Sequence, residues 1–239
     1  MSIFETHGVL PHMTRTLVLG LDEAGRGPGI GPMVLAAVAL DEVSEALLAQ
    51  AGVRDSKVFG SSSAGRQARA RLATLIREHA PFVSVEICDV ADIDAYVARS
   101  ALNLLERERA SLLIRRAPAC TRIIADGRTL FGPLSTEFPS LEAVDRAESA
   151  HTAVAAASIC AKALRDELFE AIASRYEPTF GALRGGGYVN PATVAFISEY
   201  VRRHGQLPPE ARKSWPWRGV NGLGNDNSPT TALPAPPVR

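Results

Sequence analysis

The sequence has no excess of either charge and few cysteines. Lys and Arg together number 26, as do Asp and Glu, so the formal net charge of the 239 residues is zero. No global basic field therefore attracts a polyanion, although a local group of arginines can still neutralise phosphates. The three cysteines, Cys88, Cys120 and Cys160, are an odd number without metal-ligand spacing. We expect buried free thiols in a reducing compartment, not disulfides or a zinc site.

The chain also lacks long hydrophobic runs. No stretch reaches the roughly 18 apolar residues that a bilayer-spanning helix needs. Residues 1–15 contain charged residues and a proline but no apolar core, which is unlike a secretory signal peptide. We therefore predict a cytoplasmic protein without a membrane partner, and we expect a monomer.

Signature motifs of several common enzyme classes are missing. The chain contains no G-x-x-x-x-G-K-[ST] phosphate-binding loop and no G-x-S-x-G nucleophile turn, and its five histidines have no metal-ligand spacing. The glycines of residues 25–31 fit G-x-G-x-x-G in no frame, since residue 30 is Ile and residue 32 is Pro. Two acids, Asp22 and Glu23, lie just before these glycines and would repel a pyrophosphate, which disfavours a dinucleotide site.

Hydrophobic periodicity indicates strands that are interleaved with helices. Strands are predicted over residues 16–21, 33–40, 82–87 and 122–126, with a hairpin between the first two. Helices are predicted over residues 42–50, 63–80, 100–116, 150–175 and 191–203. The pattern is typical of an α/β protein.

The composition also suggests how the chain is divided. We expect an N-terminal extension over residues 1–15 and one large α/β domain over residues 16–175. A small helical subdomain is expected over residues 176–218, and the polar, Pro-rich residues 219–239 favour a disordered tail.

Two of the predicted strands end in acids. Asp22 and Glu23 end the first strand and Asp126 ends the last, while Asp145 and Glu148 precede the Ala-rich helix. Ligands gather where the strands of an α/β sheet end. Carboxylates that converge there repel one another without a cation, and oxygen ligands select hard ions such as Mg²⁺ or Mn²⁺. Two such ions can activate water and stabilise the leaving oxygen of a phosphodiester.

Motifs that lie in order between about residues 16 and 217 carry a resemblance. They are Asp22-Glu23-Ala24-Gly25-Arg26-Gly27-Pro28, Asp55-Ser56-Lys57, Asp126-Gly127, Ala156-Ala157-Ser158-Ile159-Cys160-Ala161-Lys162 with Arg165-Asp166, Gly185-Gly186-Gly187-Tyr188 with Pro191, and Arg212-Lys213-Ser214-Trp215. Together they resemble the type 2 ribonucleases H, the ribonuclease HII family. Gly186 and Ala211 replace the Lys and His of the usual bacterial pattern, as in the archaeal-like branch.

The resemblance implies a fold and an activity. The fold would be a ribonuclease H-like mixed sheet flanked by helices, with a small C-terminal helical subdomain. The activity would be hydrolysis of the RNA strand of RNA–DNA hybrids and incision at ribonucleotides embedded in duplex DNA, giving 5′-phosphate and 3′-hydroxyl ends. The alternatives are a ribonuclease HIII-like preference for longer hybrids and a non-catalytic hybrid-binding module.

The resemblance also implies which acids act. Two Mg²⁺ or Mn²⁺ ions would be held by Asp22, Glu23, Asp126 and a fourth acid. Counting back from the Ala156-Ala157 motif, the fourth position falls on Glu148, as in ribonuclease HIII, with Asp145 as the alternative.

Substrate contacts are expected from several further residues. The turn of Gly25, Arg26 and Gly27 would bring its backbone against the ribose, whose 2′-OH distinguishes RNA from DNA. Tyr188 would stack on the neighbouring sugar and sense the RNA-to-DNA junction. Candidates for phosphate contact are Lys57, Lys162 and Arg165, with support of the carboxylates as an alternative for Lys162.

Two further groups of residues are expected to serve structure. The arginines of the helix at residues 63–80 favour a solvated helix face; they are Arg66, Arg69, Arg71 and Arg77. Trp215 and Trp217 favour anchoring of the C-terminal segment on the core.

Overall fold

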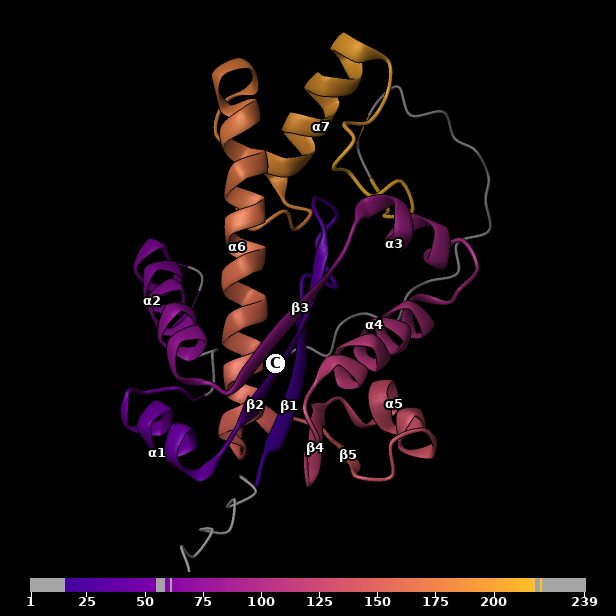
Figure 1. Ribbon diagram of the computed structural model, residues 1–239. Helices are drawn as coiled ribbons and strands as arrows, with labels where there is room; N and C mark the ends of the chain where they lie inside the picture. Colours follow the sequence, from indigo (N-terminus) through magenta and orange to yellow (C-terminus); the bar gives the residue numbers. More distant parts are fainter. Residues whose placement is uncertain (1–15, 55–58, 61, 218–219, 221–239) are drawn as a thin grey trace, which may run out of the picture.

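The computed structural model describes residues 16–54, 59–60, 62–217 and 220. Its centre is a five-stranded mixed sheet with the order β3-β2-β1-β4-β5 (Figure 1). The expected extension over residues 1–15 and nearly all of the expected tail lie outside the described residues, as does Lys57.

The sheet has an antiparallel half and a parallel half. β2 (Met33–Leu40) pairs antiparallel with β1 (Val18–Ala24) on one side and with β3 (Phe82–Cys88) on the other. β4 (Arg122–Asp126) runs parallel to β1, and β5 (Leu141–Val144) runs parallel to β4. β1 and β4 therefore end at the same edge of the sheet, so the two acid-bearing strand ends meet.

One face of the sheet is covered by α1 (Glu42–Gln50), α2 (Ser63–His79) and the first half of α6 (Thr152–Phe180) (Figure 1). The Ala-rich start of α6 packs directly on β1, because a Cβ added at Gly20 would lie 2.1 Å from the carbonyl carbon of Ala153. Only glycine on the strand and small residues on the helix permit this approach.

The opposite face is covered by α3 (Val90–Val97), α4 (Leu102–Arg116) and α5 (Arg128–Phe131) (Figure 1). Leu105 and Leu113 of α4 are fully buried against this face, as the sequence pattern predicts. The C-terminal α7 (Pro191–His204) packs beside the second half of α6.

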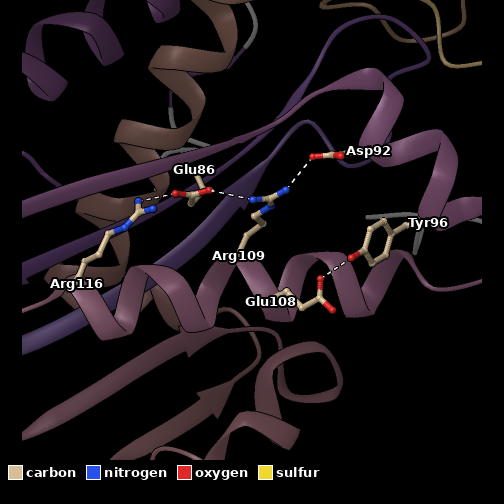
Figure 2. Close-up of polar contacts among 6 residues, drawn as sticks. All are labelled: Glu86, Asp92, Tyr96, Glu108, Arg109 and Arg116. Atoms are coloured by element: carbon tan, nitrogen blue, oxygen red, sulfur yellow. Dashed lines mark hydrogen bonds and ion pairs between the residues drawn. The ribbon is translucent and has the colours of Figure 1, made fainter.

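A chain of polar contacts fixes α4 along the edge of the sheet (Figure 2). Arg109 of α4 lies 2.8 Å from Asp92 of α3 and 3.6 Å from Glu86 of β3, and Arg116 also pairs with Glu86. Partly exposed ion pairs contribute about 1 kcal/mol or less each. Their main effect is to fix the position of α4, because they connect it to both α3 and β3.

The fold confirms most of the predicted elements and adds others. The mixed sheet flanked by helices has the expected form, but α3 and β5 were not predicted from the sequence. α6 continues to Phe180 with Pro178 inside it, so the expected boundary at residue 176 falls within a helix. Cys88 and Cys160 are buried free thiols as predicted, whereas Cys120 is a free thiol that is only partly buried.

Candidate active site

The acids of β1 and β4 lie side by side. Leu21 pairs with Ala125 in the parallel register, so the residues that follow them, Asp22 and Asp126, stand at the same level of adjacent strands. Asp22 is only 6% exposed. The strand ends therefore bring two carboxylates together, as the sequence predicted.

Strand alternation turns Asp22 and Glu23 toward different neighbours. Asp22 interacts with Ser158 and Lys162 of α6, whereas Glu23 lies in the field of Glu106 on α4 and of Arg26. The two adjacent acids thus interact with helices on opposite faces of the sheet, Asp22 with α6 and Glu23 with α4.

Glu148 and Asp145 differ in their surroundings. Glu148 lies in the 3-10 helix η3 (Ala147–Ser149), is 3% exposed and hydrogen bonds with Asp126. Asp145 is exposed, and its Oδ1 accepts a 2.8 Å hydrogen bond from the backbone N–H of Arg128. The structure therefore brings Glu148 into the acid group and leaves Asp145 at the start of α5.

The electrostatics of the acid group disfavour four negative charges. Burial is the main cause that raises the pKa of Asp22, against the ammonium of Lys162. The pKa of Glu23 is raised well above its ordinary value, first by burial and then by the charge of Asp22. Burial raises the pKa of Asp126 to about 7, and the hydrogen bond with Glu148 acts in the same direction.

This donor set fits hard divalent cations. All the acids offer oxygen ligands, and a cation would relieve their mutual repulsion. Within the part of the chain that is described, no three acid, His or Cys side chains are already gathered tightly enough to hold one ion. Binding would therefore require the carboxylates to close around the ion.

The Gly25–Gly27 turn lies next to the acids and depends on its glycines. Gly25 has φ +88°, and a Cβ there would lie 2.7 Å from Nε of Arg165. A Cβ at Gly27 would lie 3.1 Å from Cε1 of Tyr188. The 56% exposed Tyr188 ring therefore lies against the turn. Its backbone is fixed by Thr193, whose hydroxyl donates to the Tyr188 carbonyl at 2.8 Å.

A cleft of about 1070 Å³ extends from this site along α6 toward α2 and the segment before α7. Its walls include acidic, basic and aromatic side chains, among them Glu23, Arg26, Arg66, Lys162, Arg184 and Tyr188. The cleft thus begins at Glu23 and the turn and continues past positive charges, which suits a polyanion.

Two expected arginine roles change in the structure. Arg69 is buried, pairs with Asp166 at 2.5 Å and donates to the Gly60 carbonyl at 2.6 Å, so the prediction of a solvated face is wrong for this residue. Arg165 is buried and donates to the carbonyls of Ile30 at 2.7 Å and Gly186 at 3.2 Å. Its position favours holding the two glycine loops together over reaching a phosphate.

Lys162 stands beside the acids. Its Nζ lies 2.9 Å from the Ser158 hydroxyl, and its charge lowers the pKa of Asp22. This position agrees with support of the carboxylates, the alternative that the sequence left open.

Arg212 has a role that the sequence did not predict. It is fully buried and donates to the carbonyls of Gly25 at 2.6 Å, Arg26 at 2.9 Å and Gly31 at 3.0 Å. Trp215 adds a 2.8 Å bond from its indole N–H to the Gly27 carbonyl, which confirms that this tryptophan is an anchor. The Arg-Lys-Ser-Trp motif can be recognised in the sequence. Its contact with Arg26, which is 186 residues away, cannot be predicted from the sequence alone.

A five-stranded sheet of this order, with helices on both faces, is the ribonuclease H-like arrangement. Similar folds occur in the ribonuclease H2 of Pyrococcus horikoshii OT3 (TM-score 0.73, 27% identity, 84% of this chain and 95% of that chain) and in Bst-RNase HIII in complex with Mn²⁺ (TM-score 0.66, 26% identity, 85% and 68%).

The sequence comparisons are more specific. The family model for ribonuclease HII matches residues 19–217. A ribonuclease HII of Caldivirga maquilingensis is 37% identical over 205 residues, covering 84% of this chain and 92% of the relative. The chain belongs to the ribonuclease HII family. It is a ribonuclease H, an endonuclease that cleaves the RNA strand of RNA–DNA hybrids. No helix in the described residues has the length and hydrophobicity to cross a membrane.

Proposed function

We propose that this ribonuclease cleaves both RNA–DNA hybrids and duplex DNA that contains single ribonucleotides. The observation that carries the proposal is the contact between Gly27 of the turn and Tyr188, directly beside the acid group. A backbone turn and an aromatic ring at one point can read a 2′-OH and the sugar next to it. Recognition of this kind requires only one ribonucleotide in the duplex.

The acids Asp22, Glu23, Asp126 and Glu148 are proposed to hold two Mg²⁺ or Mn²⁺ ions. Bound divalent ions supply activation of water and charge stabilisation of the leaving 3′-oxygen, which gives 5′-phosphate and 3′-hydroxyl ends. The raised pKa values of Asp22, Glu23 and Asp126 support the proposal, because they mark a site that lacks compensating positive charge. The charge of Lys162 acts against this rise at Asp22, although burial outweighs it.

The turn and its neighbours are proposed to orient the substrate. The carbonyls of Gly25, Arg26 and Gly27 are bound by Arg212 and Trp215, while the same turn residues line the cleft. Orientation of this kind holds the scissile phosphate over the acids and lowers the entropic cost of reaction. A ring at Tyr188 would stack on the deoxyribose beyond the junction.

Two substrates test the proposal. The protein is incubated with Mg²⁺ or Mn²⁺ and either an RNA–DNA hybrid or a DNA duplex with one ribonucleotide, and the products are sized with their ends identified. We expect cleavage of both. Cleavage of the hybrid alone would contradict the junction-reading role and favour the ribonuclease HIII-like alternative, which Glu148 supports. If both substrates are cleaved, Tyr188→Ala should reduce cleavage of the single-ribonucleotide duplex more than cleavage of the hybrid.

A further inference from the structure

The side chain of Arg26 is held by α4, away from the carbonyl contacts of its own turn. Its Nη1 forms an ion pair with Oε1 of Glu106, and its Nη2 donates to Oδ1 of Asn103 at 2.6 Å. Asn103 and Glu106 are three residues apart and thus neighbours on one face of the helix. Two points of one helix therefore fix both ends of the guanidinium.

Glu106 is an unusual residue for the core. It is 0% exposed, and its second oxygen, Oε2, is buried without a hydrogen-bond partner in the described part of the chain. Burial raises the pKa of Glu106 to about 7 in spite of the Arg26 charge. A well-packed apolar residue at such a position is often neutral or stabilising. Fold stability alone therefore does not account for a carboxylate here.

The contacts divide the turn between two supports. Arg212 and Trp215 bind the backbone carbonyls of the turn from the C-terminal segment, and α4 binds the Arg26 side chain. Because Glu106 and Asn103 already engage the guanidinium, Arg26 is a weak candidate for holding a phosphate. Because its side chain is bound to α4 and its backbone belongs to the turn, Arg26 couples the position of the turn to that of α4.

We propose that Glu106, assisted by Asn103, is a positioning residue that aims the Gly25–Gly27 turn at the ribose through Arg26. It determines how strongly the enzyme depends on a correctly placed 2′-OH. This inference rests on the proposed reading of the ribose by the turn. It assigns that property to two α4 residues outside the acid group, one of which, Glu106, also acts on Glu23 through its charge.

The test is a double-mutant cycle between Arg26→Met and Glu106→Leu, with kcat, KM and Tm measured for each protein. Each single variant should lower kcat about tenfold to a hundredfold with little change in KM, since a misplaced turn disturbs the reacting geometry. The double variant should recover the Tm of the wild type, because the buried charge and its partner leave together. Its kcat should stay as low as that of the single variants.

Other variants keep the test decisive if Glu106→Leu does not fold. Glu106→Gln preserves shape and an acceptor for Arg26 and should retain more kcat than Glu106→Leu or Asn103→Ala. Glu108→Gln is the matched control on the same helix. Glu108 accepts a hydrogen bond from the Tyr96 hydroxyl at 2.6 Å, and this variant should behave as the wild type. Wild-type kcat in Glu106→Leu, additive losses in the cycle, or a double variant with wild-type kcat would overturn the inference.

Failure of the proposed function gives a different result. A wild-type protein that leaves the single-ribonucleotide duplex intact contradicts the reading of one ribose, whatever α4 does. The cycle is then measured on the hybrid, where loss of kcat without loss of Tm in the double variant still supports positioning by Glu106.

Discussion

The acid group and the glycine loops beside it both contain buried charges, yet they satisfy them in opposite ways. Arg212 and Arg165 lose solvation, which lowers their pKa values to about 9 and about 10, but each donates to backbone carbonyls inside the protein. Asp22 and Asp126 instead face further acids. The arginines thus have hydrogen-bond acceptors within the protein, whereas the mutual repulsion of the acids favours binding of a cation. The contrast separates arginines that stabilise the fold from acids that are proposed to bind the catalytic ions.

The largest expected effect comes from removing an acid. Asp126→Asn should lower kcat about a thousandfold, because a lost ion ligand forfeits several kcal/mol of transition-state stabilisation. The same change removes a repulsive charge, so Tm should stay constant or rise. Kinetics with Mn²⁺ and calorimetry of the metal-free protein measure the two quantities. A large fall in Tm would show that Asp126 stabilises the fold and would contradict the contrast between the two regions.

The next effect separates the two candidates for the fourth acid. Glu148→Gln should lower kcat about a hundredfold, since the buried carboxylate belongs to the acid group. Asp145→Asn is the matched control and should change kcat less than about twofold. Full activity in Glu148→Gln together with loss in Asp145→Asn would reverse the assignment.

Removal of a buried arginine should act on stability first. Arg212→Met leaves the carbonyls of Gly25, Arg26 and Gly31 without their donor, and unsatisfied buried groups cost about 1–3 kcal/mol each. We expect the free energy of unfolding to fall by about 3 kcal/mol or more, as measured by urea titration. Arg71→Met, on an exposed part of α2, is the control and should change stability by less than about 0.5 kcal/mol.

The smallest effect concerns pH and Glu106. Burial raises its pKa from 4.5 to about 7 in the folded protein, so the folded state binds more protons than the unfolded state between these values. Stability should therefore fall as pH rises from about 4.5 to 7 and level off above, by about 2–3 kcal/mol for this group. Glu106→Gln should remove that part of the slope in urea titrations of the metal-free protein. An unchanged slope would show that Glu106 titrates normally.

The sequence was sufficient for patterns that are local. Apolar runs that end in Asp22 and Asp126 predicted both strands and the meeting of their acids, because parallel strands end at one edge. Elements with weak local signals were missed: β5 has only four residues, and α3 has eight. Arg69 was misjudged because its partner, Asp166, lies 97 residues away and gives no sign near α2.

By itself the sequence determined the acids, the glycine turn, the tyrosine and the family to which the chain belongs, because each depends on residue type and order along a short segment. Only the tertiary structure decided that Glu148 faces Asp126 while Asp145 binds the start of α5. It alone also showed that Arg212 binds the backbone carbonyls of the turn while Glu106 binds the Arg26 side chain. The physical reason is that burial and hydrogen bonding depend on neighbours in space, which a linear pattern does not contain.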